Sequence, residues 1–220
     1  MADQTVDLTS PEPPRDCPLC PRLVAYRRVN QAEHPEWFNG PAPSFGDRNA
    51  RLLVAGLAPG RTGANRTGRP FTGDHAGWLL YETLGKTGFA RGRFEARTDD
   101  SLDLVDCMIT NAVRCAPPLN KPETSEEKAC RPFFVNTLEA LPNLKVIVTL
   151  GDVSRRSLLR ALNLKGSVGQ PGHGSEFQAG PYRVINSYHC SRLNTNTGRL
   201  TPAMFEDIFR RARILIEEGR

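Results

Sequence analysis

Short apolar runs alternate along this chain with longer stretches whose apolar positions recur at helical spacing. The apolar runs predict four buried strands, at residues 51–56, 106–113, 145–150 and 182–188. The longer stretches predict four helices, at 75–84, 124–141, 151–162 and 202–218. Because strands and helices alternate, we expect an α/β fold with a mostly parallel four-stranded sheet covered by helices on both faces.

Two of these helices carry more specific expectations. In the first, Trp78, Leu79 and Leu80 are expected to face the core. In the second, Thr124 and Glu127 have the spacing of a capping box, in which each side chain accepts a hydrogen bond from the other residue's backbone N–H.

Ligands of such sheets bind beyond the carboxyl ends of the strands. Three segments leave predicted strands at that edge: a Gly-rich loop at 57–74, "RCAPPLNKP" and "HCSRLNTNTGRL". We expect the three segments to converge on one crevice.

The Gly-rich loop "LAPGRTGANRTGRPFTGD" invites comparison with phosphate-binding loops, whose backbone N–H groups surround a phosphate. The P-loop pattern fails, because Gly56 and Gly60 are separated by one residue too few and the lysine is missing. The dinucleotide pattern G-x-G-x-x-G is also absent. An ordinary ordered loop remains an alternative, but so many Gly and Arg residues favour a ligand site.

The length of 220 residues suits one sizeable domain. Residues 1–16 are polar and Pro-rich and lack the apolar core of a signal peptide, so we expect a flexible arm followed by a single domain over 17–220. The chain has no apolar run long enough to span a membrane, and we expect a cytoplasmic monomer. The net charge of +5 permits binding to nucleic acid without demonstrating it.

The six cysteines suggest a metal centre, because a cytosolic chain rarely holds disulfides. Cys17 and Cys20 form the motif "CPLC", Cys115 follows a predicted strand, and Cys130 lies on the next predicted helix. Four thiolates suit either structural zinc or an iron–sulfur cluster. A zinc ribbon normally has two close cysteine pairs, so one pair with two dispersed cysteines favours a cluster. Cys107 lies within an apolar strand and is expected to be a core residue.

The segments "GLAPGRTGANRTGRPFTGD", "VRCAPPLNKP" and "SYHCSRLNTNTGRL" together resemble the uracil-DNA glycosylase superfamily, and more narrowly its family 5, the iron–sulfur type of bacteria and archaea. The resemblance runs from Cys17 to about Phe205 and implies a three-layer α/β/α sandwich. It also implies that one [4Fe–4S] cluster with a structural role is held by four ligands. These are Cys17, Cys20, Cys115 and Cys130.

The first motif departs from the better-known relatives, which have an acidic residue in it. The five corresponding positions here are Gly56, Leu57, Ala58, Pro59 and Gly60. Leu57 and Ala58 cannot polarise water, so the resemblance points to two other residues for this role, Asp74 and Asn120. Gly60 stands where narrow-specificity relatives have a tyrosine, which implies a roomier pocket.

The resemblance implies the removal of uracil, hypoxanthine or xanthine from damaged DNA by hydrolysis of the N-glycosidic bond, which leaves an abasic site. The base must first be extruded from the duplex. His189 would then stabilise the departing base, and Asp74 and Asn120 would act at the sugar or on the attacking water. The base would be bound by Gly56, Leu57, Ala58, Gly60 and Phe71, with Phe71 stacking on it. The DNA would be contacted by Arg66, Ser191, Arg192 and Leu193, with Leu193 as the wedge.

Two alternatives compete with this interpretation. A non-enzymatic zinc protein could bind nucleic acid through its basic loops, and it would be colourless where a cluster protein is brown. A family 4 relative that traps the sugar through a histidine in a "KRRIH"-type insertion is set aside, because no such insertion follows the Gly-rich loop.

Overall fold

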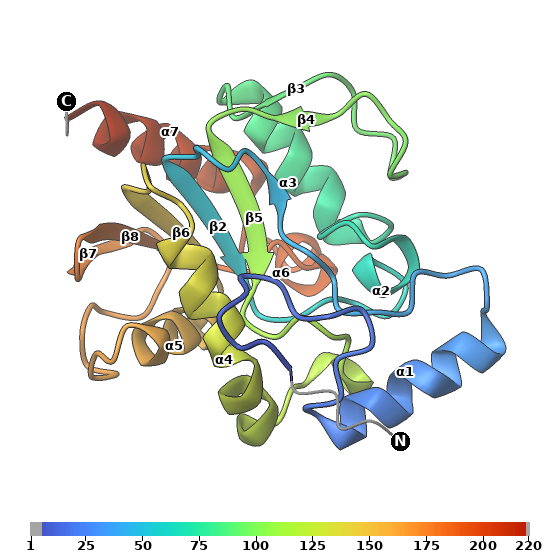
Figure 1. Cartoon of the computed structure of the whole chain (residues 1–220). Coiled ribbons are helices and arrows are strands. Elements are labelled where there is room, and N and C mark those ends of the chain that lie inside the picture. The colour runs from blue at the N-terminus through green and yellow to red at the C-terminus, as the bar shows by residue number, and fades with distance from the viewer. Residues whose placement is uncertain (1–5, 219–220) are drawn as a thin grey trace.

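A six-stranded sheet, in the order β1-β5-β2-β6-β8-β7, forms the centre of the computed structural model, which describes residues 6–218 (Figure 1). The strands of this sheet are β1 Phe45–Gly46, β2 Leu52–Gly56, β5 Cys107–Asn111, β6 Val146–Leu150, β7 Ser175–Ala179 and β8 Tyr182–Ser187. A separate antiparallel pair joins β3 (Ala90–Arg91) to β4 (Asp103–Leu104). The helices are α1 Pro21–Glu33, α2 Ala64–Thr67, α3 His75–Lys86, η1 Pro118–Asn120, α4 Thr124–Glu139, α5 Asp152–Ala161, α6 Arg192–Asn196 and α7 Pro202–Glu218.

The four predicted strands form the parallel centre of the sheet, β5-β2-β6-β8. The expectation of a four-stranded sheet was wrong in number, because β1 and β7 add antiparallel edges. The sequence hid both edges. β1 has only two residues, and β7 ("SEFQA") alternates polar and apolar residues as a half-exposed edge strand does.

Helices cover both faces of the sheet, as predicted (Figure 1). Alternate strand residues point to opposite faces, so Leu52 and Val54 of β2 belong to one buried cluster and Leu53 and Ala55 to another. The first cluster includes buried residues of α3 and α7, and the second includes those of α4 and α5. The result is the three-layer arrangement.

Two helix details differ from the sequence expectations. Trp78 does not face the core but is 53% exposed, and its ring meets Phe94 edge-on with 5.0 Å between centroids. The capping box at the start of α4 is formed by Glu123 and Glu126, one residue earlier than predicted. The Glu127 side chain points instead toward α5 and accepts a hydrogen bond from Arg160 of that helix at 2.8 Å.

The described part of the predicted flexible arm, residues 6–16, lies against the domain. Glu12 pairs with the buried Arg114 at 2.8 Å, and the Asn136 amide donates to the carbonyl oxygens of Leu8 and Ser10 at 2.6 and 2.9 Å. Residues 1–5 of the predicted arm are outside the described part of the chain. Within residues 6–218, no helix is long and apolar enough to cross a membrane.

Candidate active site

A cavity of about 430 Å³ opens at the carboxyl edge of the parallel strands, and we call it the strand-edge pocket. All three segments that follow predicted strands contribute to it, as expected. Its lining residues are Leu57, Ala58, Pro59, Gly60, Arg61, Thr62, Phe71, Asp74, His75, Ala76, Asn111, Asn120, His189, Ser191 and Arg192.

Asn111, the last residue of β5, brings an unpaired amide oxygen to this pocket. It is 3% exposed, and its Oδ1 is buried without a hydrogen-bond partner among the described residues. Gly56 is its register partner on β2, and a Cβ at Gly56 would clash with Oδ1 and press against the Phe71 ring. Gly56 therefore makes room for two lining side chains and does not line the pocket itself.

Asp74 is the N-cap of α3, and its Oδ1 accepts a hydrogen bond from the Gly77 backbone N–H at 3.2 Å. The other oxygen, Oδ2, faces the Gly-rich loop. A Cβ at Gly60 would lie 3.4 Å from it, and a Cβ at Gly63 would clash with it. Gly60 and Gly63 therefore leave the space that the carboxylate occupies. Burial in this space raises the pKa of Asp74.

His189 follows β8 and faces Phe71 across the pocket, with 6.1 Å between ring centroids. The Asn194 amide donates to the His189 backbone carbonyl at 2.8 Å, which fixes the start of the loop. Burial lowers the pKa of His189, so the ring is held in its neutral form. A neutral imidazole can donate one N–H to a ligand.

The remaining predicted residues are placed in two groups. Asn120 lies at the end of an exposed turn with a positive φ of 56° and lines the pocket, as do Ser191 and Arg192. Leu193, at 73% exposure, and Arg66 are not among the lining residues. Arg66 braces the Gly-rich loop, because it donates to the carbonyl oxygens of Thr62 and Gly73 at 3.0 and 3.3 Å.

The sequence analysis missed several polar lining residues, namely Asn111, Arg61, Thr62 and His75. Asn111 carried a signal, since it is a polar residue at the end of an otherwise apolar strand. Arg61 carried no such signal in the sequence, because the residues that it contacts are distant from it along the chain. It donates to Asn30 and Glu33 of α1, at 2.6 Å in each case.

A second cavity, here called the cysteine cavity, brings together the four predicted metal ligands. Cys17, Cys20, Cys115 and Cys130 line it together with apolar side chains such as Leu19, Leu23, Val24 and Val113. Among residues 6–218, no group of three or more His, Cys, Asp or Glu side chains has an arrangement suited to a single metal ion. Cys107 and Cys190 lie elsewhere, fully buried in the core, as predicted for Cys107.

Two hydrogen-bond donors contact sulfurs of the cysteine cavity. The Arg27 guanidinium lies 3.9 Å from the Cys115 sulfur, and the Arg114 backbone N–H donates to the Cys130 sulfur at 3.3 Å. Burial and mutual repulsion raise the pKa of Cys20 and Cys115 to about 12 each. An apolar cavity of four such thiols fits a group that supplies its own positive charge.

Comparisons with known proteins agree with this geometry. Residues 43–213 match the family model of the uracil DNA glycosylase superfamily. The chain is 44% identical over 207 residues to a type-5 uracil-DNA glycosylase of Thermus thermophilus, a match that covers 90% of this chain and 93% of that protein. A protein of the same name from Pyrobaculum aerophilum is 38% identical over 201 residues, covering 90% and 88%. A type-4 uracil-DNA glycosylase of Thermotoga maritima is 31% identical over 176 residues, covering 79% and 82%.

Proposed function

The chain belongs to the uracil DNA glycosylase superfamily, and from that premise we propose that it removes uracil and other deaminated bases, chiefly hypoxanthine and also xanthine, from DNA by hydrolysing the N-glycosidic bond. The observation that carries the proposal is the strand-edge pocket. One cavity of about 430 Å³ holds an aromatic ring, an unpaired amide oxygen, a carboxylate and an imidazole. Its size suits an extruded nucleotide.

Phe71 and Asn111 would recognise the extruded base. The Phe71 ring offers a face on which either a pyrimidine or a purine can stack. Deamination gives uracil and hypoxanthine a ring N–H beside a carbonyl, whereas cytosine and adenine have an acceptor nitrogen beside an amino group. The unpaired Asn111 Oδ1 can accept from that N–H, while its amide N–H₂ donates to the carbonyl. The pairing favours deaminated bases over their parents.

His189 and Asp74 would perform the bond cleavage. Negative charge develops on the departing base, and an N–H from the neutral His189 ring would stabilise it, at O2 when the base is uracil. Positive charge develops on the sugar, where the Asp74 carboxylate would stabilise it or orient the attacking water. Asn120, which also lines the pocket, would help to hold this water.

Ser191, Arg192 and Leu193 would contact the DNA around the vacated position. Extrusion of a base costs a few kcal/mol of stacking and pairing, which contacts to the flanking phosphates offset. Leu193 is an exposed apolar residue next to the pocket rim, as insertion into a base stack would require. Damaged DNA is therefore the proposed partner.

The cysteine cavity would hold one [4Fe–4S] cluster through Cys17, Cys20, Cys115 and Cys130. The support is that one cavity gathers four thiols, two of them buried and two half-buried, and that burial raises their pKa values, so a positively charged occupant would favour their ionised form. When bound, the cluster would supply a cross-link between the start of α1 and the segment from β5 to α4.

A cleavage panel tests the proposed function. Matched duplexes carrying uracil, hypoxanthine, xanthine, thymine, cytosine or adenine at one position are incubated with the protein and then treated with alkali to reveal abasic sites. We expect strand breaks at the deaminated bases only, and their loss in Asp74→Asn. A colourless protein with stoichiometric zinc that leaves every base in place would instead support the alternative of a non-enzymatic nucleic-acid-binding protein.

A further inference from the structure

Phe71 has a backbone conformation that an aromatic residue rarely adopts. Its φ is +53°, in the left-handed region, where the side chain crowds its own backbone. The ring is nevertheless buried in the wall of the strand-edge pocket. Surrounding contacts must therefore hold the turn of residues 69–72 in place.

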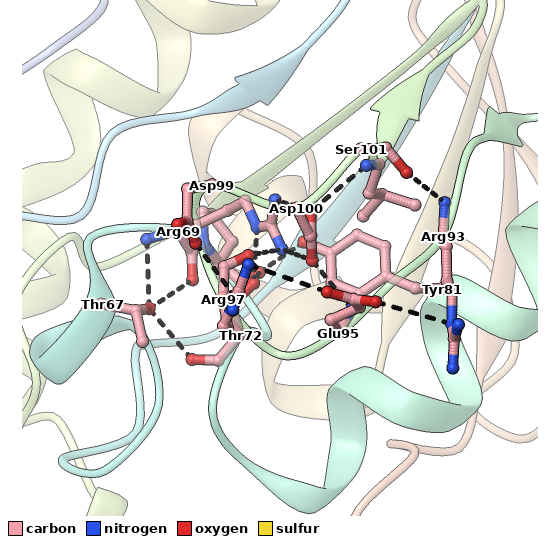
Figure 2. A network of polar contacts seen from close by, with 12 residues as sticks. Thr67, Arg69, Thr72, Tyr81, Arg93, Glu95, Arg97, Asp99, Asp100 and Ser101 are labelled. Carbon is pink, nitrogen blue, oxygen red and sulfur yellow. Dashed lines mark hydrogen bonds and ion pairs between the residues drawn. The ribbon is translucent and has the colours of Figure 1, made fainter.

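Arg69 makes one of these contacts with its side chain and ties the turn to a second loop (Figure 2). Its side chain is 6% exposed, and its Nε donates to the Thr72 hydroxyl at 2.8 Å. Its two terminal nitrogens donate to the two carboxylate oxygens of Asp100, each at 2.8 Å. The planar guanidinium thus links the turn that contains Phe71 to a carboxylate 31 residues away.

Asp100 lies in the loop of residues 92–102, which joins β3 to β4. Its side chain is fully buried, and it also accepts hydrogen bonds from the backbone N–H groups of Glu95 and Leu102, at 2.9 and 3.2 Å. Burial alone would raise the pKa of Asp100, but Arg69 and these N–H groups outweigh burial and lower the pKa to about 2. The pair is therefore ionised throughout the physiological range.

Two further hydroxyl groups close the turn. Tyr81 of α3 donates to the Pro70 carbonyl at 2.5 Å, and Thr67 donates to the Thr72 carbonyl at 3.0 Å. The rings of Phe45, Tyr81 and Phe94 surround the Arg69 guanidinium, with 5.2 to 5.7 Å from its carbon to each ring centroid. The backbone on both sides of Phe71 is thus held by buried groups.

The outer part of the same network is of a different kind. Arg93 and Arg97 are 84% and 61% exposed and lie 3.2 to 3.8 Å from Glu95 and Asp99. Exposed pairs of this type contribute little to stability. The buried inner part, Arg69, Thr72 and Asp100, is joined to the turn that contains Phe71.

We infer that Arg69 and Asp100 are positioning residues for base removal: they hold the turn so that the Phe71 ring stays in the wall of the strand-edge pocket. The 92–102 loop is then an outer support of the site, although no residue of it lines that pocket. The inference rests on the proposed function, because a fixed ring matters for the reaction only if the extruded base stacks on it.

The Thr72 hydroxyl allows the link to be cut without disturbing the ion pair. Thr72→Val removes the acceptor for Arg69 at nearly constant volume, whereas Thr72→Ser keeps it. We expect Thr72→Val to slow single-turnover uracil release by about tenfold and Thr72→Ser to stay within about twofold of wild type, since small misplacements of binding groups lower rates strongly. Asp100→Asn should slow release by ~10- to 100-fold, and Asp103→Asn, an exposed carboxylate of the same hairpin, serves as the matched control.

The decisive comparison repeats these changes in a Phe71→Ala background. If Arg69 and Asp100 act through Phe71, Thr72→Val and Asp100→Asn should change the rate there by less than about twofold. Equal slowing in both backgrounds would mean that the contacts of Arg69 with Thr72 and Asp100 serve the fold alone, and it would overturn the inference. A Thr72→Ser variant as slow as Thr72→Val would overturn it too.

A spectroscopic readout keeps this test separate from the proposed function. Labelling with 4-fluorophenylalanine gives one fluorine NMR signal for each of ten phenylalanines, and Phe71→Leu identifies the one of interest. Thr72→Val should shift or broaden the Phe71 signal, and Asp103→Asn should not. An unmoved Phe71 signal in Thr72→Val overturns the inference. If wild type releases no uracil, the proposed function fails, but the fluorine signal still shows whether Arg69 and Asp100 hold the Phe71 ring in place.

Discussion

The strand-edge pocket and the cysteine cavity both gather reactive side chains from segments distant in sequence, but the two differ in the polarity of their lining. The pocket is open, and its unpaired Asn111 oxygen lies among other polar groups from three loops. The cysteine cavity is lined mainly by sulfur and apolar side chains, and its thiols have raised pKa values. A polar site suits a ligand that enters and leaves, whereas an apolar site lined by four thiols suits a permanent occupant.

Helix α1 joins the two regions. It starts directly after Cys20, its Arg27 contacts the Cys115 sulfur, and its Asn30 accepts from Arg61 of the pocket. The proposed occupant of the cysteine cavity would therefore support the pocket through contacts between protein groups, so we expect its removal to weaken the fold and changes in the pocket to slow the reaction.

The largest expected effect comes from removing a cluster ligand. Replacing Cys17, Cys20, Cys115 or Cys130 singly by alanine should abolish the brown colour, measured as absorbance near roughly 400 nm, and most of the soluble yield. Cys107→Ala and Cys190→Ala should keep the colour, because both thiols lie in the core away from the cavity. A protein bleached by Cys107→Ala but not by Cys130→Ala would show that the ligands are assigned wrongly.

His189→Ala should affect chemistry without affecting structure. Loss of a donor to the departing base typically slows a reaction by ~10²–10³-fold. Single-turnover kinetics at saturating enzyme would measure the rate of base release, and equilibrium titration would show nearly unchanged affinity for DNA. A rate close to that of wild type would remove His189 from the mechanism.

The pH dependence should separate Asp74 from His189. Asp74 must be ionised, and burial raises its pKa above the usual value of about 4, so the rate should begin to fall at a higher pH than an ordinary aspartate would cause. His189 must be neutral, and burial lowers its pKa below about 6.5, so the rate should stay level as the pH falls through 6.5. The Asp74→Asn variant should release the base much more slowly at every pH, and its rate should no longer fall in acid. A wild-type rate that declines around pH 6.5 would instead assign the loss of rate in acid to protonation of His189.

The smallest effect concerns which bases are accepted. Gly60→Tyr should lower hypoxanthine release about tenfold more than uracil release, because it fills space beside the pocket. Gly60→Ala is the necessary control, since its Cβ would lie 3.4 Å from the Asp74 carboxylate and tests contact with that group alone. An unchanged ratio of the two rates in Gly60→Tyr would mean that Gly60 does not set the breadth.

The sequence predicted the parallel centre of the sheet because its strands are short, apolar and followed by helices. It missed the edges, since β1 is too short and β7 too polar to stand out. The helical pattern also predicts an inward Trp78, but its side chain is exposed and packs edge-on against Phe94 of the 92–102 loop.

His189 could be placed at the pocket because it directly follows a strand, and Asp74 was indicated by the family resemblance of the loop that it ends. The supports of the site could not. The contact of Arg69 with Asp100 spans 31 residues and that of Arg61 with Asn30 also spans 31, and neither follows any local pattern. Such contacts depend on how the loops fold over one another.

Base recognition depends on Asn111 in this proposal, because its unpaired amide oxygen would select deaminated bases in the strand-edge pocket. The most direct measurement is single-turnover release of free uracil and free hypoxanthine from matched duplexes by wild type and by Asn111→Ala. We predict that wild type releases both bases and that Asn111→Ala releases each ~10- to 100-fold more slowly, with unchanged affinity for abasic DNA. Release of neither base by wild type, or of both at the wild-type rate by Asn111→Ala, would contradict the account.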